Sequence, residues 1–133
     1  MNRRRKVGGA ELDGFDGVLD TGFGGFSSAA GTMVFSFATP GDSLDEAYAV
    51  DVDPLTGEIY VGGYTATFDL FTLDFNSNLA VAKLNSDGSF DSDWIFGGQT
   101  IITLPVPISG INKLSVLPDG GLLLAGDFAG GFD

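Results

Sequence analysis

The sequence contains neither cysteine nor histidine among its 133 residues. The lack of cysteine excludes disulfide bonds and thiolate chemistry. The lack of both residues excludes Ser-His-Asp and Cys-His nucleophile systems, zinc sites built from His or Cys, and haem ligation in its usual forms, because each needs an imidazole or a thiolate. We therefore expect no catalytic residue and no cofactor-binding residue, and we predict that the protein is not an enzyme.

Long hydrophobic runs are also missing. No stretch approaches the roughly 20 apolar residues that a helix needs to cross a bilayer. Residues 3–6 are basic, as at the start of a signal peptide, but residues 7–20 (VGGAELDGFDGVLD) contain four acidic residues and no continuous apolar segment. The sequence therefore predicts neither a signal peptide nor a transmembrane segment in this chain.

Basic residues are few, and four of the six lie together at Arg3, Arg4, Arg5 and Lys6. Residues 7–133 carry 2 basic and 18 acidic side chains, a net charge of −16. Such a body repels nucleic acid and anionic lipid, so neither is an expected partner. Because guanidinium groups pair well with carboxylates, we predict that the four basic residues bind an acidic surface of a neighbouring copy or of another protein subunit. A disordered tail is the alternative interpretation.

The composition is that of a folded domain: 44% of residues are hydrophobic and 18% are charged, with 21 Gly and 12 Phe. Short apolar segments alternate with clusters of Gly, Asp, Asn and Pro, and no window has helical periodicity. The sequence therefore predicts an all-β protein. The expected strands are Met33–Phe37, Ala47–Asp51, Glu58–Gly62, Leu79–Leu84, Thr100–Leu104, Lys113–Val116 and Gly121–Ala125.

Two segments combine Pro and Gly as tight turns require, namely residues 53–57 (DPLTG) and 117–120 (LPDG). Each is expected to join two adjacent antiparallel strands. These turns also belong to an internal repeat, since residues 49–63 correspond to residues 113–126 with Pro54 and Pro118 aligned. A second repeat relates residues 16–25 to residues 87–98, with loops of different length.

The segments LNSDGSFD (residues 84–91) and LPDGGLLLAG (residues 117–126) resemble the delta-60 repeat family of predicted β-propellers, and the resemblance covers about residues 14–128. It implies about two propeller-blade-like antiparallel β-repeats in residues 14–133, preceded by an extended N-terminal arm, residues 1–13. Residues 65–76 depart from the family pattern and are expected to form an inserted loop. Trp94-Ile95 also lengthens the second copy of the motif, and residues 22–24 shorten the first.

A propeller needs at least about four blades to close, so about two units do not form a ring alone. The expected solutions are a fragment of a longer protein, a short sheet or open sandwich, or a unit completed by other chains. Family members are mostly bacterial surface proteins, and similar repeats occur in phage tail appendages.

Residues 87–93 (DGSFDSD) place side-chain oxygen atoms at alternate positions, from Asp87, Ser89, Asp91 and Asp93, as a calcium site requires. An EF-hand loop would have Gly and Glu at the positions of Ser92 and Gly98. A structural turn at Asp-Gly-Ser is therefore the favoured interpretation, and a calcium site is the alternative.

Five further acidic residues are candidates for the carboxylate pair of a glycoside hydrolase, which needs no histidine: Asp42, Asp45, Glu46, Asp51 and Asp53. Their spacing is not specific for catalysis. On a strand, Asp51 and Asp53 share one face while Val50 and Val52 point the other way, which predicts a solvated acidic face.

The remaining candidates are expected to be structural. The glycines at residues 22–25 and 62–63 lack the Lys-Ser/Thr and helix of a phosphate site, so they indicate strand ends and close packing. Five phenylalanines are expected in the core rather than in a binding platform: Phe35, Phe37, Phe68, Phe71 and Phe75.

Together, these features predict a non-catalytic structural or adhesive β-repeat protein, a component of a larger assembly such as a phage virion (tail fibre or appendage), anchored by its N-terminal arm. The expected location is the virion, the cell surface or the extracellular space. One alternative is a fragment of a secreted or cell-surface β-propeller binding protein. The other is a carboxylate-dependent carbohydrate-active enzyme.

Overall fold

The computed structural model describes residues 6–14, 16–26, 28–37, 43–103 and 110–127. These residues form three antiparallel sheets, so the all-β prediction is confirmed. The strands are β1 (Val7–Ala10), β2 (Thr32–Phe35), β3 (Ser43–Val52), β4 (Ile59–Asp69), β5 (Asp74–Leu84), β6 (Gln99–Ile102), β7 (Gly110–Val116) and β8 (Leu122–Asp127). A short helical turn, α1 (Ile95–Gly98), precedes β6.

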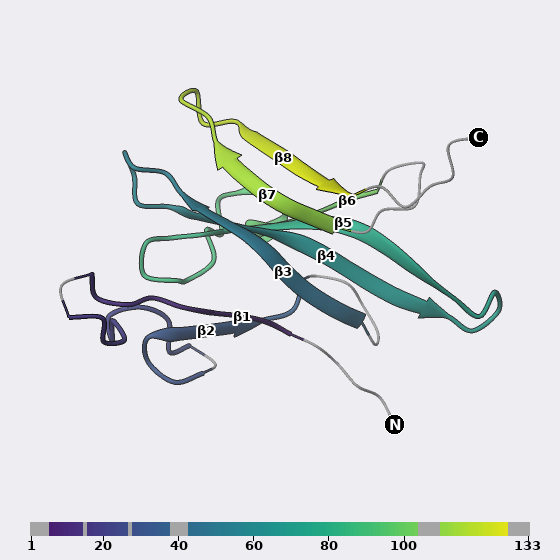
Figure 1. Cartoon of the computed structure of the whole chain (residues 1–133), viewed down its shortest axis with the longest axis horizontal. Helices are drawn as coiled ribbons and strands as arrows, with labels where there is room; N and C mark the ends of the chain where they lie inside the picture. Colours follow the sequence, from purple (N-terminus) through teal and green to yellow (C-terminus); the bar gives the residue numbers. More distant parts are fainter. Residues whose placement is uncertain (1–5, 15, 27, 38–42, 104–109, 128–133) are drawn as a thin grey trace.

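The sheets form three layers (Figure 1). The central sheet has four strands in the order β3-β4-β5-β6, and the two-stranded sheets β1-β2 and β7-β8 lie on its opposite faces. Successive side chains of a strand point to opposite faces. Ala80, Ala82 and Leu84 on β5 therefore pack toward β1-β2, whereas Leu79 and Val81 pack toward β7-β8. The sheet thus separates two hydrophobic cores.

Aromatic residues fill the core between β1-β2 and the central sheet. The ring of Phe35 meets those of Phe37 and Phe90 edge to face, with centroids 5.5 and 5.2 Å apart. The prediction of Phe35 and Phe37 as core residues is therefore confirmed. It is wrong for Phe71, which is 99% exposed at the turn between β4 and β5. The side chains of Phe68 and Phe75 lie outside the described residues.

The expected strands are present, but two segments differ from the sequence interpretation. Val7–Ala10, assigned to the N-terminal arm, form β1 and pair with β2. The two glycines of this segment have low strand propensity, so the local sequence does not predict a strand here, and the segment is recognised as one by its pairing with β2. Residues 65–76, expected as an inserted loop, are the paired ends of β4 and β5 around a turn at residues 70–73. That expectation is wrong because strand pairing satisfies the backbone polar groups of this segment.

The hairpins β3-β4 and β7-β8 are copies of one another, and we call them the leading hairpins. The register shifts at a β-bulge between Ala47 and Ala49 in β3, and between Ile111 and Lys113 in β7, which is 64 residues later in each case. β4 and β8 correspond at an offset of 63 residues, because the second turn is one residue shorter. Both predicted turns join the strands of these hairpins.

The pairs β1-β2 and β5-β6 are also copies, and we call them the trailing hairpins. Val7–Ala10 pair with Thr32–Phe35 in the same register in which Leu79–Ala82 pair with Gln99–Ile102. The offset is 72 residues in the first strand and 67 in the second. The chain therefore runs as trailing, leading, trailing and leading hairpin, and the central sheet is one leading hairpin joined to one trailing hairpin.

The turns that follow β1 and β5 share their backbone hydrogen bonds. In both, two bonds cross the turn and a third closes it at the same positions, offset by 71 or 72 residues. In the first turn they are Asp20 N to Glu11 O (2.9 Å), Asp13 N to Val18 O (2.6 Å) and Gly17 N to Asp13 O (2.8 Å); in the second they are Asp91 N to Lys83 O (3.0 Å), Asn85 N to Ser89 O (2.7 Å) and Gly88 N to Asn85 O (2.9 Å).

Candidate interaction surfaces

The aspartates proposed as calcium ligands lie in the turn that follows β5, and they bind its backbone and side chains. Asp87 Oδ1 accepts hydrogen bonds from the backbone N and the hydroxyl of Ser89, at 2.9 and 2.6 Å, and these bonds lower the pKa of Asp87. Asp91 Oδ1 accepts a bond from the backbone N of Asp93 at 3.1 Å. Within the described ranges, no group of three or more acidic residues is arranged to hold a metal ion.

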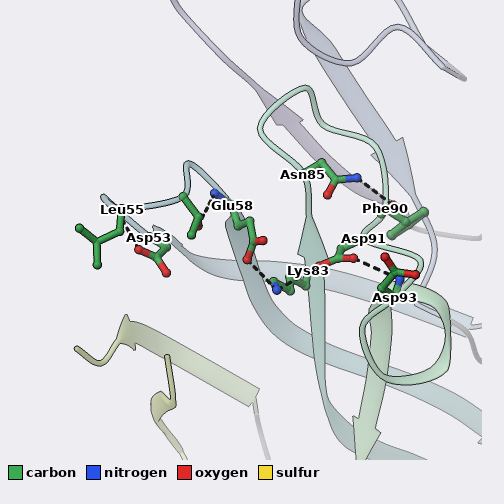
Figure 2. Close-up of polar contacts among 9 residues, drawn as sticks. Asp53, Leu55, Glu58, Lys83, Asn85, Phe90, Asp91 and Asp93 are labelled. Carbon is green, nitrogen blue, oxygen red and sulfur yellow. Dashed lines mark hydrogen bonds and ion pairs between the residues drawn. The ribbon is translucent and has the colours of Figure 1, made fainter. Parts of the chain in front are cut away.

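Lys83 is the charged centre of this turn (Figure 2). Its Nζ lies 2.6 Å from Glu58 and 3.0 Å from Asp91, and 5.6 Å from the ring centroid of Tyr60. Burial alone lowers the pKa of Lys83, but hydrogen bonds to the two carboxylates outweigh it and raise the pKa above its usual value. The same bond from Lys83 lowers the pKa of Asp91. These groups fix β4, β5 and the turn together.

The acidic residues that could form a catalytic pair have different structural positions and partners. Asp45 is buried and lies opposite Thr65, and Glu46 accepts a hydrogen bond from the hydroxyl of Tyr48. Asp53 Oδ1 accepts a bond from Leu55 N at 2.9 Å in the β3-β4 turn (Figure 2). Asp42 lies outside the described residues.

Asp51 differs from its predicted position on a solvated face. Its Oδ2 accepts a hydrogen bond from Val116 N at 2.8 Å, which joins β3 to β7. The valines on the other face of β3 are the exposed side chains, 65% for Val50 and 46% for Val52. The prediction is wrong in this respect because β7 covers the Asp51 side of the strand, whereas no described strand covers the Val50 side.

The glycines predicted for close packing are confirmed in that role. A Cβ atom at Gly63 would lie 1.8 Å from the backbone O of Glu46, and one at Gly24 would lie 1.9 Å from the O of Thr32. Gly62 packs against Leu114 of β7. These positions allow backbones and sheets to approach one another.

The basic segment predicted to bind an acidic partner is only partly described. Arg3, Arg4 and Arg5 lie outside the described residues, and Lys6 is exposed just before β1. Lys6 borders a hollow that Asp45 and Glu46 also line. The described end of the basic segment therefore lies beside Glu46 and the buried Asp45 of the same chain.

An apolar groove runs along β1 and β3, and we call it the β1-β3 groove. It has a volume of about 700 Å³ and is lined by residues of both strands, including Val50 and Val52. Phe23, Phe35 and Leu84 of the adjacent core form its floor. Exposed valines and core side chains thus form one apolar surface.

A second groove, the β6-β8 groove, lies on the opposite face of the central sheet. It has a volume of about 350 Å³ and is lined by Tyr60 and Ile102 of the central sheet, by Trp94 just before α1, and by Leu122 and Leu124 of β8. The next side chain of β8, that of Leu123, points away from the core and is 60% exposed. An apolar groove therefore lies beside each of the two outer hairpins, β1-β2 and β7-β8.

Neither groove is predictable from the local sequence. Val50, Val52 and Leu123 look like ordinary strand residues, and their exposure depends on which sheets are present beside them. The internal repeat is the sequence signal that could reveal the grooves. It places a trailing hairpin (β1-β2) before the central sheet and a leading hairpin (β7-β8) after it, and each of these covers only part of one face of that sheet.

Comparison of the chain with protein-family models, with curated proteins and with solved structures found no match. Across the part of the chain that the structure describes, no helix is long and apolar enough to span a membrane.

Proposed function

We propose that this chain is a non-catalytic structural protein whose stacked, blade-like sheets form part of a larger assembly. The observation that carries the proposal is the repetition of both hairpins with the same register, bulge and turn hydrogen bonds. Proteins made of such repeats bury each sheet against its neighbours and present long continuous surfaces. The central sheet already follows this plan, since a two-stranded sheet packs against part of each of its faces.

A propeller-like arrangement is the form of assembly that these features support best. Propeller blades are four-stranded antiparallel sheets that stack face to face around an axis. The central sheet has four antiparallel strands, and the flanking hairpins correspond to the halves of two further sheets. The resemblance to the delta-60 repeats supports the same arrangement.

The use of the acidic side chains supports a non-catalytic role. Asp51, Asp87 and Asp91 accept hydrogen bonds from the backbone, and Asp91 also pairs with Lys83. Glycoside hydrolysis uses a pair of carboxyl groups that flank the scissile bond, whereas these carboxylates bond to the turns and strands of the chain itself. The enzyme alternative requires that the unmodified protein hydrolyses a glycoside and that Asp51→Asn abolishes this activity. We expect no hydrolysis by the unmodified protein or by the variant.

The resemblance supports a phage tail fibre or appendage as the setting of this assembly. The test is sedimentation of extracts and purified particles that contain the chain in its natural context, followed by detection with an antibody. We expect the chain in particles far heavier than the free protein, with labelling at one position on them in electron micrographs. Detection of the chain only as a free protein would contradict the structural role.

A further inference from the structure

Among the described residues six strands have an edge without a partner, and two of them, β1 and β8, correspond to strands that are paired on both edges in the central sheet. β1 pairs only with β2, and β8 pairs only with β7, whereas the corresponding strands β5 and β4 of the central sheet pair with each other. Open strand edges are templates for pairing with another chain. β1 corresponds to β5 and β8 corresponds to β4, so each open edge is the natural partner of the other.

Residues that are exposed in one copy of a hairpin are buried in the other. Leu123 is 60% exposed, but the corresponding Tyr60 in the central sheet is 4% exposed. Val50 is 65% exposed, but the corresponding Leu114 in β7 is 7% exposed. The difference in burial follows from the neighbouring sheet that each position has or lacks.

The trailing hairpin β1-β2 gives the same result. Gly8 and Ala10 are exposed, and the corresponding Ala80 and Ala82 of the central sheet are fully buried. Small side chains at these positions allow the next sheet to approach closely. The outer face of β1-β2 is therefore shaped like a face that the central sheet buries.

We propose that copies of this chain associate head to tail, with β8 of one protomer pairing antiparallel with β1 of its partner to complete a four-stranded sheet. This inference rests on the proposed function as an assembly of stacked sheets. The described part of each chain holds a leading hairpin at one end and a trailing hairpin at the other, so each protomer supplies what its partner lacks.

The new sheet would continue two interfaces that the chain already makes within itself. Its leading half packs on the central sheet of one protomer, as β7-β8 does, and its trailing half packs on the central sheet of the partner, as β1-β2 does. Leu123 of the first protomer would then cover the β1-β3 groove of the partner. The outer face of β1-β2 of the partner would cover the β6-β8 groove of the first protomer. Pairing of β8 with β1 thus closes both grooves.

The β4-β5 register sets the register of the proposed contact. Gly62 pairs with Val81, so Ala125 of one protomer would lie opposite Gly9 of its partner. Each protomer contributes its central sheet and a share of one completed sheet. Because propellers close with about four to eight blades, two to four protomers would close a ring. This is a heterologous contact, which forms rings when its rotation closes.

The charge of the chain separates this contact from association through the basic segment. The chain carries a net charge of −12, so copies that meet through apolar faces repel one another and salt should strengthen their association. Association of Arg3, Arg4 and Arg5 with acidic surfaces would instead weaken in salt.

The first test is the mass of the purified chain by light scattering at low and moderate salt. We expect two to four times 13.8 kDa, with the share of oligomer rising with salt and protein concentration. Leu123→Asp and Val50→Asp should return the protein to a monomer with unchanged circular dichroism. The matched control is Leu55→Asp, at a position that is 87% exposed in the β3-β4 turn, and it should remain oligomeric.

The second test uses the absence of natural cysteine to check the register. Gly9→Cys and Ala125→Cys proteins, mixed under oxidising conditions, should form a disulfide-linked pair, because directly opposed residues have Cβ atoms about 4.5–5.5 Å apart. A Cβ at Gly9 or at Gly8 has open space around it. Gly8→Cys mixed with Ala125→Cys should not link, because neighbouring side chains of a strand point to opposite faces.

A monomer under all conditions overturns the inference, and the sedimentation of particles then tests the proposed function separately. An oligomer that survives both aspartate variants, or that dissociates in salt, also overturns it. Loss of the chain from all large particles, together with a salt-strengthened and correctly cross-linked oligomer, would instead contradict the proposed function alone.

Discussion

Glu11 and Lys83 occupy corresponding positions in the two trailing hairpins, and each faces an aspartate at a corresponding position, but their side chains carry opposite charges. The backbone O of each accepts a hydrogen bond from an aspartate N, Asp20 for Glu11 and Asp91 for Lys83. In the second copy the side chains form an ion pair. In the first copy two carboxyl groups meet, and burial, a hydrogen bond with Asp20 and the charge of Asp20 raise the pKa of Glu11. The two copies should therefore respond differently to pH.

Glu11→Gln should stabilise the protein at pH 7 by about 0.5 kcal/mol, because two carboxylates held side by side in a turn repel each other. The pKa of Glu11 is higher in the folded than in the unfolded protein, so the ionised carboxyl opposes folding above the folded pKa. This cost disappears below the usual pKa of 4.5. Urea unfolding at pH 7 and pH 3.5 checks both expectations, and Glu58→Gln, which breaks an ion pair, should destabilise at pH 7. An equal effect of Glu11→Gln at both pH values would contradict the assignment.

Lys83→Met should lower the thermal unfolding midpoint by roughly 5 °C, since Glu58 and Asp91 lose their shared cation. The matched control is Lys113→Met, because Lys113 is exposed on β7 and should tolerate the change within about 1–2 °C. Scanning calorimetry of the two variants compares them directly. Equal shifts would show that the ion pairs of Lys83 contribute no more than an exposed lysine does.

Gly63→Ala should destabilise the protein by about 2–3 kcal/mol, because the new methyl group would overlap the backbone O of Glu46 and force β3 and β4 apart. Gly14→Ala is the control, since a Cβ at Gly14 has no atom within 4 Å. Its effect should stay within about 0.5 kcal/mol. Denaturant titration measures both, and a near-neutral Gly63→Ala protein would mean that the two strands do not pair as described.

Asp51→Ala should cost about 1–2 kcal/mol, because Val116 N loses its hydrogen-bond acceptor between β3 and β7. Asp51→Asn keeps an acceptor oxygen and should recover most of this loss. Asp93→Ala removes an exposed carboxylate and should have little effect. Hydrogen exchange at Val116 tests the mechanism, since its amide should exchange faster in Asp51→Ala than in the other two variants. Unchanged protection in Asp51→Ala would contradict the inter-sheet role.

The sequence by itself determined the local structure and the repeat. Short β-prone segments, the Pro-Gly turns at residues 53–57 and 117–120, and the Asp-Gly turns specified antiparallel hairpins, because turn chemistry depends on neighbouring residues alone. Self-comparison also found both pairs of repeats, although their division into leading and trailing hairpins needed the strand registers.

Only the tertiary structure decided which faces of the strands are covered. Asp51 and Val50 alternate as a solvated strand would, yet Asp51 turns toward β7 and Val50 is exposed, because burial depends on which sheet lies against each face. Residues 65–69 and 74–76 became paired ends of β4 and β5, and Val7–Ala10 paired with β2, because strand pairing depends on a partner strand that local propensity does not report. The same dependence on neighbouring sheets leaves β1 and β8 with open edges.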